Sequence, residues 1–588
     1  MRQQYARRTQ IVMIVMGFVA FAIIFQMARI QNSTEAAEVI RRGMVYQYEP
    51  RTIFPDRGEI YDRNGHLLAG NKSVFEIGVD LNTVKDPEAI AVAVSAELGI
   101  DYSKILNDIQ NPPAKVSYVV IADFVGSQNA LRLKDLRKKF QEQAEEGTFG
   151  RLTGLNFKPH PQRSYPEKSL ASNIIGFVSR EGRGYFGIEE KYDTLLAGNP
   201  VQVLVPTDPN NASEITQVPN GTTLILTINR DLQAAAEKIL DDALNTYGAK
   251  GGTIVIMDPR NGELLTIAST PRMDLNQFWN YGAIYKNASD FNLGISTPYE
   301  PGSVLKILTM AAALDSGTVT PGTTYLDTGS ILVGGALIQN WDKNPWGVQD
   351  MTGCLQHSLN VCMATLSTSM GPGTFYDYMD KFGLGHLTGV DLAGEAAGRL
   401  KTPGDSDWYL VDLATNAFGQ GVAATPLQIM MAASAIANHG RSVTPHALYA
   451  MVRNERQYNA PAQYAGSPIS EQTANTLSEM LAVSLETEGS LALVPGYRIA
   501  GKTGTAQVPI NGFYDSNKTN ASFLGWGPVD DPQFMIYVWL EEPTKSILGS
   551  ATAWGSETAA PVFAQIAEKA VILLDIPPDS IRKKLAQK

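Results

Sequence analysis

Three short groups of residues in the second half of the chain have the types and spacing needed for acyl transfer. Ser303 and Lys306 follow a Pro-Gly break, and a helix that begins there would carry both side chains on one face. A serine becomes a nucleophile when a base takes its proton, and a lysine is such a base when burial and nearby positive charge lower its pKa. The helix N-terminus also stabilises developing negative charge. We therefore predict Ser303 as nucleophile and Lys306 as general base.

The second group is Ser358-Leu359-Asn360, within a stretch over 350–370 that has the pattern of a helix. Its hydroxyl could relay a proton, and its amide could hold a substrate carbonyl. The same pattern also occurs at residues 127–129, and a second Ser-x-x-Lys pair lies at Ser580 and Lys583. Each pattern alone is therefore weak evidence, and only their combination indicates a site.

The third group, Lys502-Thr503-Gly504-Thr505, lies in a segment with strand character. In a strand, Lys502 and Gly504 share one face. We expect Gly504 to leave room for a substrate backbone at a strand edge, and Lys502 to attract a carboxylate. The backbone N–H of Thr505 could complete an oxyanion hole.

The elements around these groups predict an antiparallel sheet covered by helices, of the α/β or α+β class. A strand and an amphipathic helix come first, and a hairpin turning at Pro-Arg-Asn-Gly follows. A mostly helical region leads to three consecutive strands and a final apolar helix. The corresponding residues are 221–229, 231–244, 251–270, 290–490, 496–543 and 557–574.

The N-terminal third is predicted to contain both helices and strands and to be rich in strands. A polar segment at 30–50 is predicted to be helical, a hairpin is predicted to turn at Asp62–Gly65, and a charged helix is expected at 129–146. A loop rich in Pro, Asn and Asp at 205–221 indicates a domain boundary. Residues 577–588 are expected to form a solvated basic tail.

The strongest physical signal lies at the N-terminus. Arg2, Arg7 and Arg8 precede an apolar run over 11–25, and Arg29 follows it shortly after. About 18 helical residues rise roughly 27 Å, enough to cross a hydrocarbon core. The basic flank is expected in the cytoplasm and the remainder outside. A cleaved signal peptide is the alternative, but the run is long for one and lacks a convincing cleavage site.

Composition excludes several functional classes. The chain has 588 residues, of which 44% are apolar, and its net charge of −11 argues against a nucleic-acid partner. Two cysteines and six histidines show no metal-ligand spacing, and no phosphate-binding or dinucleotide fingerprint occurs. In the predicted helix, Cys354 and Cys362 would lie about 12 Å apart, too far for a disulfide, so we predict two buried thiols.

The order Ser-x-x-Lys, Ser-x-Asn, Lys-Thr-Gly resembles the signature of penicillin-binding proteins. The chain is similar to their class B, with a transpeptidase fold and an N-terminal pedestal domain. The motifs YEPGS and FGQGVAATPLQ resemble the cell-division type, including sporulation relatives, more than the elongation type. The transpeptidase likeness covers 220–575, the pedestal likeness covers 57–69, 163–178 and 187–198, and the two motifs lie at 299–303 and 418–428.

This resemblance implies a peptidoglycan D,D-transpeptidase. Ser303 would attack the D-Ala-D-Ala bond of a stem peptide with Lys306 as base, and D-Ala would leave. Ser358, assisted by Lys502, would pass the proton to the leaving amine, while Asn360 holds the donor peptide. An amine of a neighbouring stem peptide would then resolve the acyl-enzyme into a cross-link.

The resemblance also implies how ligands bind. Lys502, Thr503 and Thr505, with Gly504 between them, would bind the terminal carboxylate of the substrate or of a β-lactam. The N–H groups of Ser303 and Thr505 would form the oxyanion hole. No metal, organic cofactor or glycosyltransferase domain is expected. The expected partners are a glycan polymerase of the SEDS family and other membrane proteins of division or elongation.

The expected domain limits follow from these observations. They are a cytoplasmic tail at 1–10, a transmembrane helix at 11–29, a pedestal at 30–217, a transpeptidase domain at 218–576 and a basic tail at 577–588. The catalytic domain would lie outside a bacterial cell membrane.

Other readings remain open at this point. An elongation-type transpeptidase or a D,D-carboxypeptidase would use the same residues. A class A β-lactamase would need a deacylating glutamate, and Glu471 instead fits a surface helix. A catalytically silent scaffold or β-lactam sensor is a different class, and the intact Ser303, Lys306 and Lys502 argue against it.

Overall fold

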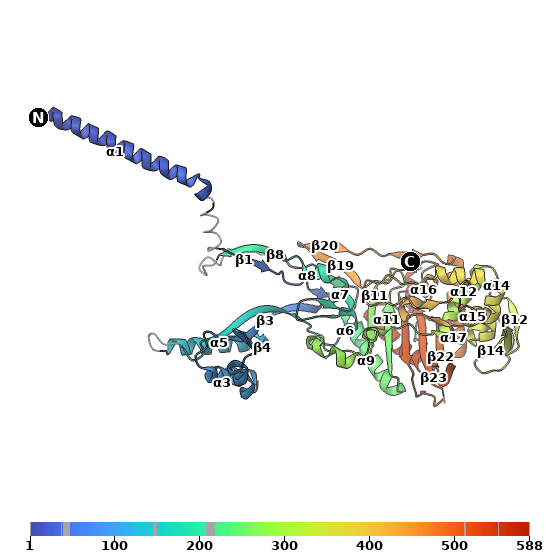
Figure 1. Cartoon of the computed structure of the whole chain (residues 1–588). Helices are drawn as coiled ribbons and strands as arrows, with labels where there is room; N and C mark the ends of the chain where they lie inside the picture. Colours follow the sequence, from blue (N-terminus) through green and yellow to red (C-terminus); the bar gives the residue numbers. More distant parts are fainter. Residues whose placement is uncertain are drawn as a thin grey trace. The chain divides into compact units, whose positions relative to one another are not determined.

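The computed structural model describes residues 2–36, 38, 48–144, 150–206, 218–510, 513–550 and 552–586. The chain separates into two compact units, and the first contains residues 1–56 and 198–221. Its helix α1 (Arg2–Gln31) is the one helix in the described residues that is long and apolar enough to cross a membrane (Figure 1). The first unit also holds an antiparallel pair, β1 (Tyr48–Ile53) with β8 (Val201–Pro206).

A helix at 30–50 and a boundary loop at 205–221 were predicted for this unit. The helix expected over 30–50 is wrong at residues 48–50, which belong to β1 and pair with β8. The pairing brings together segments about 150 residues apart, which the local pattern could not reveal. Residues 39–47, and residues 207–217 of the predicted boundary loop, lie outside the described residues.

The second unit contains residues 57–197 and 222–588. It opens with the predicted hairpin, β2 (Ile60–Tyr61) and β3 (Leu67–Asp80). Asp62 closes the turn because its Oδ1 accepts hydrogen bonds from the backbone N–H groups of Asn64 at 2.9 Å and His66 at 2.7 Å.

Strand β3 also pairs with β4 and β5, and three helices pack their apolar faces on this part of the sheet. The predicted charged helix is observed as α5. The elements are α3 (Pro87–Leu98), α4 (Tyr102–Gln110), β4 (Tyr118–Gly126), α5 (Ser127–Glu142) and β5 (Leu155–Ser164).

A buried ion cluster holds the next short elements together. Glu189 is fully buried in α7 (Gly187–Lys191), and its two carboxylate oxygens each accept a hydrogen bond at 2.7 Å, from Arg57 and from Arg163. Because both arginines are also almost fully buried, loss of the carboxylate would leave Arg163 without an ion-pair partner among the described residues and Arg57 with Asp193 alone.

The predicted antiparallel sheet is observed in the C-terminal part. It has five strands in the order β11-β10-β24-β23-β22, which confirms the predicted hairpin and the three later strands. Helices α9 and α18 pack together on one face, and α11 and α16 contact the other. The elements are α9 (Arg230–Tyr247), β10 (Gly251–Met257), β11 (Leu264–Ser269), α11 (Leu293–Ser296), α16 (Pro426–Ala437), β22 (Ala500–Ile510), β23 (Phe513–Gly527), β24 (Phe534–Glu541) and α18 (Ala559–Leu573).

The region over 290–490 is less helical than predicted. Besides its helices it contains short antiparallel pairs, among them β12 with β15 and β13 with β14, and a hairpin, β19 with β20. The strands are β12 (Thr324–Asp327), β13 (Ser330–Val333), β14 (Ala336–Gln339), β15 (Gly347–Asp350), β19 (Leu448–Arg453) and β20 (Arg456–Asn459). The helices are α12 (Lys306–Asp315), α13 (Met351–Gln356), α14 (Asn360–Lys381), α15 (Leu410–Asn416) and α17 (Glu471–Glu488).

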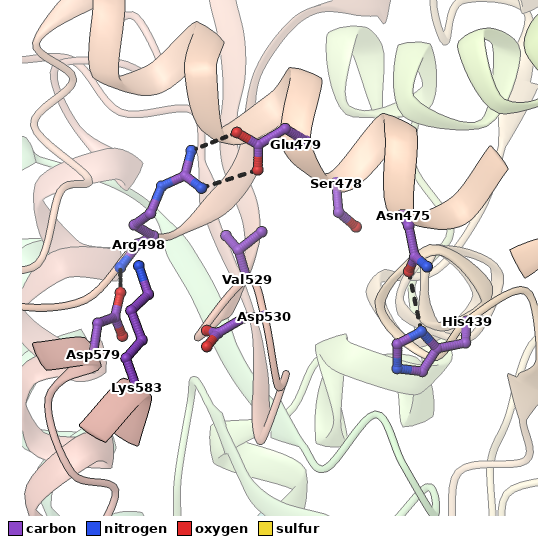
Figure 2. Close-up of a pocket in the computed structure, with 9 residues that line it drawn as sticks. All are labelled: His439, Asn475, Ser478, Glu479, Arg498, Val529, Asp530, Asp579 and Lys583. Atoms are coloured by element: carbon purple, nitrogen blue, oxygen red, sulfur yellow. Dashed lines mark hydrogen bonds and ion pairs between the residues drawn. The ribbon is translucent and has the colours of Figure 1, made fainter. Parts of the chain in front are cut away.

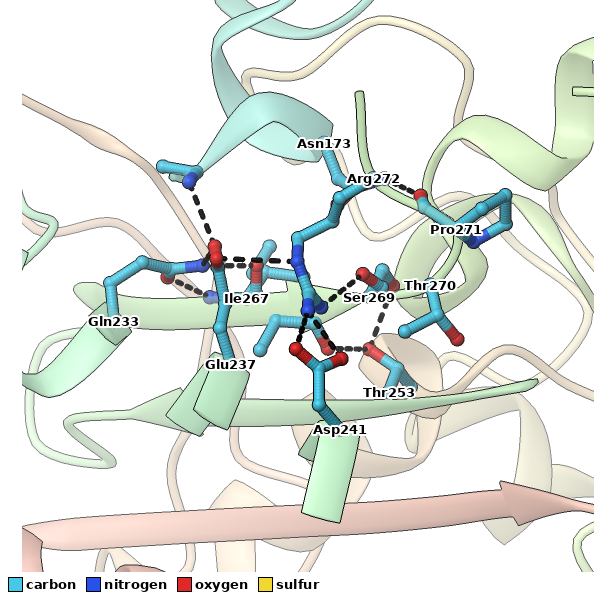
Figure 3. A network of polar contacts seen from close by, with 12 residues as sticks. Asn173, Gln233, Glu237, Asp241, Thr253, Ile267, Ser269, Thr270, Pro271 and Arg272 are labelled. Atoms are coloured by element: carbon cyan, nitrogen blue, oxygen red, sulfur yellow. Dashed lines mark hydrogen bonds and ion pairs between the residues drawn. The ribbon is translucent and has the colours of Figure 1, made fainter. Parts of the chain in front are cut away.

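A second sheet joins the two halves of this unit. Its order β20-β19-β9-β2-β3-β4, with β5 beside β3, places β9 (Thr223–Leu226) between strands from opposite ends of the sequence. A polar network adds to this connection (Figure 3). Glu237 of α9 accepts a hydrogen bond from the backbone N–H of Ala171 at 2.8 Å and forms an ion pair with Arg272 at 3.3 Å.

The C-terminal segment, predicted as a solvated basic tail, is largely exposed but has a regular structure that we did not predict. It forms helix α19 (Asp579–Ala586), which docks beside α17 around a cavity of ≈ 260 Å³ (Figure 2). Asp579 accepts a hydrogen bond from the backbone N–H of Arg498 at 2.8 Å, and the Arg582 side chain is only 10% exposed. Paired charges such as Arg498 with Glu479, at 2.9 Å, line the cavity, so we interpret it as a docking contact of α19.

Candidate active site

Ser303 lies where the predicted helix start is observed. Residues Gly302–Leu305 form a 3-10 turn, and α12 begins at Lys306. Gly302 has a φ of 59°, and a Cβ there would lie 3.2 Å from the carbonyl oxygen of Thr505. A glycine is needed because the turn that carries Ser303 packs tightly against β22.

Lys306 connects the first two groups of residues. Its side chain is fully buried, and Nζ lies 2.6 Å from the carbonyl oxygen of Ser358, 3.1 Å from Ser358 Oγ and 2.8 Å from Asn360 Oδ1. Burial, and next the positive charge of Lys502, hold the pKa of Lys306 well below its ordinary value. A neutral Lys306 donates to the two carbonyl-type oxygens and keeps a lone pair for a hydroxyl proton.

Ser358 does not lie on a continuous helix, and this prediction was wrong. Helix α13 ends at Gln356 and α14 begins at Asn360, while Ser358 has a φ of 53° in the turn between them. The hydrogen bonds to Lys306 hold this unusual conformation.

The same turn overturns our prediction for the cysteines. Cys354 and Cys362 form a disulfide, with their Cα atoms 6.1 Å apart. The distance of about 12 Å assumed one straight helix, and the break at Ser358 brings the two helix ends together. The bridge therefore encloses Ser358 and Asn360, between its two cysteines.

The third group occupies the edge strand β22. Lys502 and Gly504 lie on its buried face, as the period of two predicts, while Thr503 and Thr505 face the cleft. A Cβ on Gly504 would lie 2.3 Å from Ser522 Oγ and 2.8 Å from Val304 Cγ2. The space that we assigned to a substrate backbone is thus filled by the protein itself.

Lys502 is more enclosed than a surface carboxylate binder would be. Its side chain is 5% exposed, and Nζ donates to Thr503 Oγ1 at 3.3 Å. Burial lowers the pKa of Lys502 to about 8, and the nearby carboxylate of Glu488 opposes this shift. The ammonium group is therefore close to its titration point near neutral pH.

These side chains converge on one cleft of ≈ 340 Å³. The sequence did not predict the aromatic and acidic residues that line this cleft, because no short spacing along the chain relates them to the three motifs. Rings of Trp341 and Trp554 meet edge-on with centroids 5.5 Å apart, and Trp346 stacks on His357 at 4.1 Å. The cleft is lined by Ser303, Trp341, Trp346, Gln356, His357, Ser358, Asn360, Glu488, Thr503, Thr505, Trp554, Ser556 and Glu557.

Comparison with known proteins agrees with this geometry. Residues 252–568 match the family described as the penicillin-binding protein transpeptidase domain, and residues 52–222 match the penicillin-binding protein dimerisation domain. Stage V sporulation protein D of Bacillus subtilis is 32% identical over 549 residues, covering 90% of this chain and 80% of that protein. A probable peptidoglycan D,D-transpeptidase PenA of Neisseria meningitidis is 28% identical over 541 residues, covering 90% and 86%.

A solved structure is also similar. Penicillin-binding protein 3 of Mycobacterium tuberculosis, complexed with aztreonam, superposes with a TM-score of 0.68 at 27% identity. The match covers 90% of this chain and 98% of that one. All three residue groups of the cleft lie within the stretch matched to the transpeptidase domain.

Proposed function

Because the chain belongs to the class B penicillin-binding proteins and is a peptidoglycan D,D-transpeptidase, we propose that Ser303 is its acylated nucleophile and Lys306 its general base. The observation that supports this assignment is the buried amine of Lys306, which contacts Ser358 and Asn360 directly. A lysine with a depressed pKa can be neutral near physiological pH and accept a hydroxyl proton.

We assign the steps of acylation to these groups as follows. Lys306 takes the proton of Ser303 while the serine oxygen attacks the carbonyl carbon of the penultimate D-Ala. The N–H groups of Ser303 and Thr505 donate to the oxyanion of the tetrahedral intermediate. The proton passes through Ser358, assisted by the charge of Lys502, to the amine of the leaving D-Ala.

Substrate binding is assigned to the cleft side of β22 and to the turn before α14. Asn360 holds the donor peptide, and Thr503 and Thr505 bind its terminal carboxylate, supported by their position on the wall of the cleft. Lys502 supplies positive charge from behind the strand, and Gly504 lets that strand pack on the Ser303 turn.

The test of the nucleophile is covalent labelling with a fluorescent penicillin, followed by mapping of the modified peptide. Ser303→Ala removes one oxygen atom at a helix start, so it should abolish labelling while the fold persists. The matched control is Ser580→Ala, in the second Ser-x-x-Lys pair, which should label like the wild type. Labelling of Ser303→Ala at a stoichiometry near one would contradict the assignment.

The protein is a single-pass membrane protein, and we assign its orientation from charge. Arg7 and Arg8 precede the apolar part of α1, so the N-terminus should be cytoplasmic and the cleft outside the cell membrane. A reporter that is active only outside the cytoplasm, fused after Lys588, should be active. If a reporter that is active only in the cytoplasm were active at the same position, the cleft would lie on the opposite side of the membrane from its substrate, and the orientation would be refuted.

We further assign the protein to septal wall synthesis, in complex with a SEDS-family glycan polymerase and other division proteins. The sporulation relative supports this assignment. The domain limits of 30–217 and 218–576 also remain our proposal, beside the family matches at 52–222 and 252–568. The septal assignment predicts that a fluorescent fusion of the protein localises at mid-cell and that a glycan polymerase co-purifies with it. A uniform distribution along the side wall would favour elongation.

A further inference from the structure

Two acidic side chains line the active-site cleft, and their surroundings differ. The Glu557 carboxylate is occupied, because its oxygens accept hydrogen bonds from the hydroxyl groups of Ser546 and Ser550. Among the described residues, no hydrogen bond or salt bridge holds the carboxylate of Glu488. Glu488 interacts instead through the electrostatic attraction of Lys502.

The position of Glu488 in the fold is unfavourable for a carboxylate. It is the last residue of α17, directly before the C-cap Gly489, which has a φ of 61°. The C-terminus of a helix carries partial negative charge, and α17 has no basic residue in its last turn. Although Glu488 as a whole is an exposed residue, the partial burial of its carboxylate raises its pKa, and the attraction of Lys502 opposes this rise. A residue that breaks a local rule at the rim of a reactive cleft suggests a functional reason.

The chemistry of transpeptidation supplies that reason. The acceptor of the acyl group is an amine, which is an ammonium ion in water near neutral pH. Lys502, which lies beside the cleft, still carries positive charge near neutral pH, so the approach of another cation is opposed. A carboxylate without a hydrogen-bond partner in the same cleft would offset this repulsion and orient the incoming nitrogen.

We propose that Glu488 binds the ammonium group of the acceptor stem peptide and holds it beside the acylated Ser303. This inference rests on the transpeptidase function. After the ammonium loses one proton to solvent, the amine nitrogen forms a bond to the acyl carbon and the ester bond to Ser303 breaks. The second proton moves through Ser358 and Lys306 to the serine oxygen, which restores the free enzyme. Glu488 takes no part in the first, acylating half of the reaction.

The experiment measures how the acyl-enzyme divides between acceptors. The detergent-solubilised full chain is given an acyl-D-alanyl thioester donor, with a D-amino acid amide as the amine acceptor and glycerol as a neutral acceptor. In Glu488→Gln, the ratio of aminolysis to hydrolysis should fall about tenfold, since a charge-assisted contact is lost. The ratio of alcoholysis to hydrolysis should stay unchanged, because glycerol carries no charge.

Two variants serve as controls. Glu557→Gln removes a charge from the same cleft, but one already engaged by serine hydroxyls, so its aminolysis ratio should match the wild type. Glu488→Asp keeps the charge on a shorter side chain and should lie between Glu488→Gln and the wild type. Stoichiometric labelling by a fluorescent penicillin verifies that each variant is folded.

Each outcome has a definite meaning. A normal aminolysis ratio in Glu488→Gln would overturn the inference. An equal fall of aminolysis and alcoholysis in Glu488→Gln would also overturn it. So would slower acylation with an unchanged ratio of aminolysis to hydrolysis, because Glu488 would then act through Lys502. If the wild-type chain formed no acyl-enzyme at all, the proposed function would fail, and this inference would fail with it.

Discussion

Breaking the disulfide between Cys354 and Cys362 should affect both the stability and the chemistry of the protein. The bond joins residues eight positions apart, and the turn that it closes carries Ser358. Closing a loop of this length removes enough entropy from the unfolded chain to stabilise the native state by about 2.5 kcal/mol at 25 °C. Urea unfolding in dithiothreitol should therefore show a smaller free energy of unfolding by about this amount.

The effect on chemistry follows from the backbone at Ser358. A non-glycine residue with positive φ costs about 1–3 kcal/mol, and the bridge helps to hold it there. Without the bridge, the turn can relax and carry Ser358 away from Lys306. We expect penicillin acylation to slow by about five- to thirtyfold, the factor that corresponds to 1–2 kcal/mol.

The assay is simple to interpret because the chain contains only these two cysteines. Alkylation followed by mass measurement verifies that the bond has been reduced. A Cys354→Ala, Cys362→Ala double variant should behave like the reduced protein and be insensitive to dithiothreitol. If the bond were fully reduced and both the unfolding midpoint and the acylation rate stayed at their oxidised values, the reasoning would be refuted.

Three further predictions concern buried charges. Lys306→Ala should lower the acylation rate about 10²–10⁴-fold, nearly as much as Ser303→Ala, because base and nucleophile act as a unit. If Lys306→Ala were acylated at the wild-type rate at neutral pH, another residue would have to be the base. Acylation should rise with pH as Lys306 loses its proton, and Lys502→Met should move this rise to higher pH. The reason is that removing a neighbouring positive charge makes protonation of Lys306 easier, and a shift to lower pH in the rate profile would contradict it. Glu189→Gln should cost about 3–5 kcal/mol in urea unfolding, because it leaves the buried Arg163 unpaired and Arg57 with Asp193 alone. The exposed Glu142→Gln should cost under about 0.5 kcal/mol. Equal costs for these last two variants would show that burial of the cluster does not matter.

Local signals were sufficient for much of the fold. The Asp-Arg-Asn-Gly and Pro-Arg-Asn-Gly turns predicted their hairpins, and the Pro-Gly break predicted the helix start at Ser303. The period of two in β22 predicted that Lys502 and Gly504 share a face. These features depend on backbone preferences within a few residues, which a sequence expresses directly.

Other features depend on which distant segments meet. Nothing near Ser358 indicated a break in the helix, because the partner that stabilises its turn, Lys306, lies 52 residues away. The disulfide followed from that break and was missed with it. The role expected for Gly504 was wrong for a similar reason, since the atoms that need its space belong to Ser522 and Val304.

The amino-acid sequence by itself determined the reactive groups, the membrane helix and the order of strands and helices, because each of these depends on the types of residues that lie close together in the chain. The tertiary structure alone decided that Lys306 is buried against Ser358 and that Glu488 faces the same cleft from the end of α17. Burial and proximity, which depress the pKa of Lys306 and leave Glu488 facing Lys502, arise only when segments far apart in the chain pack together.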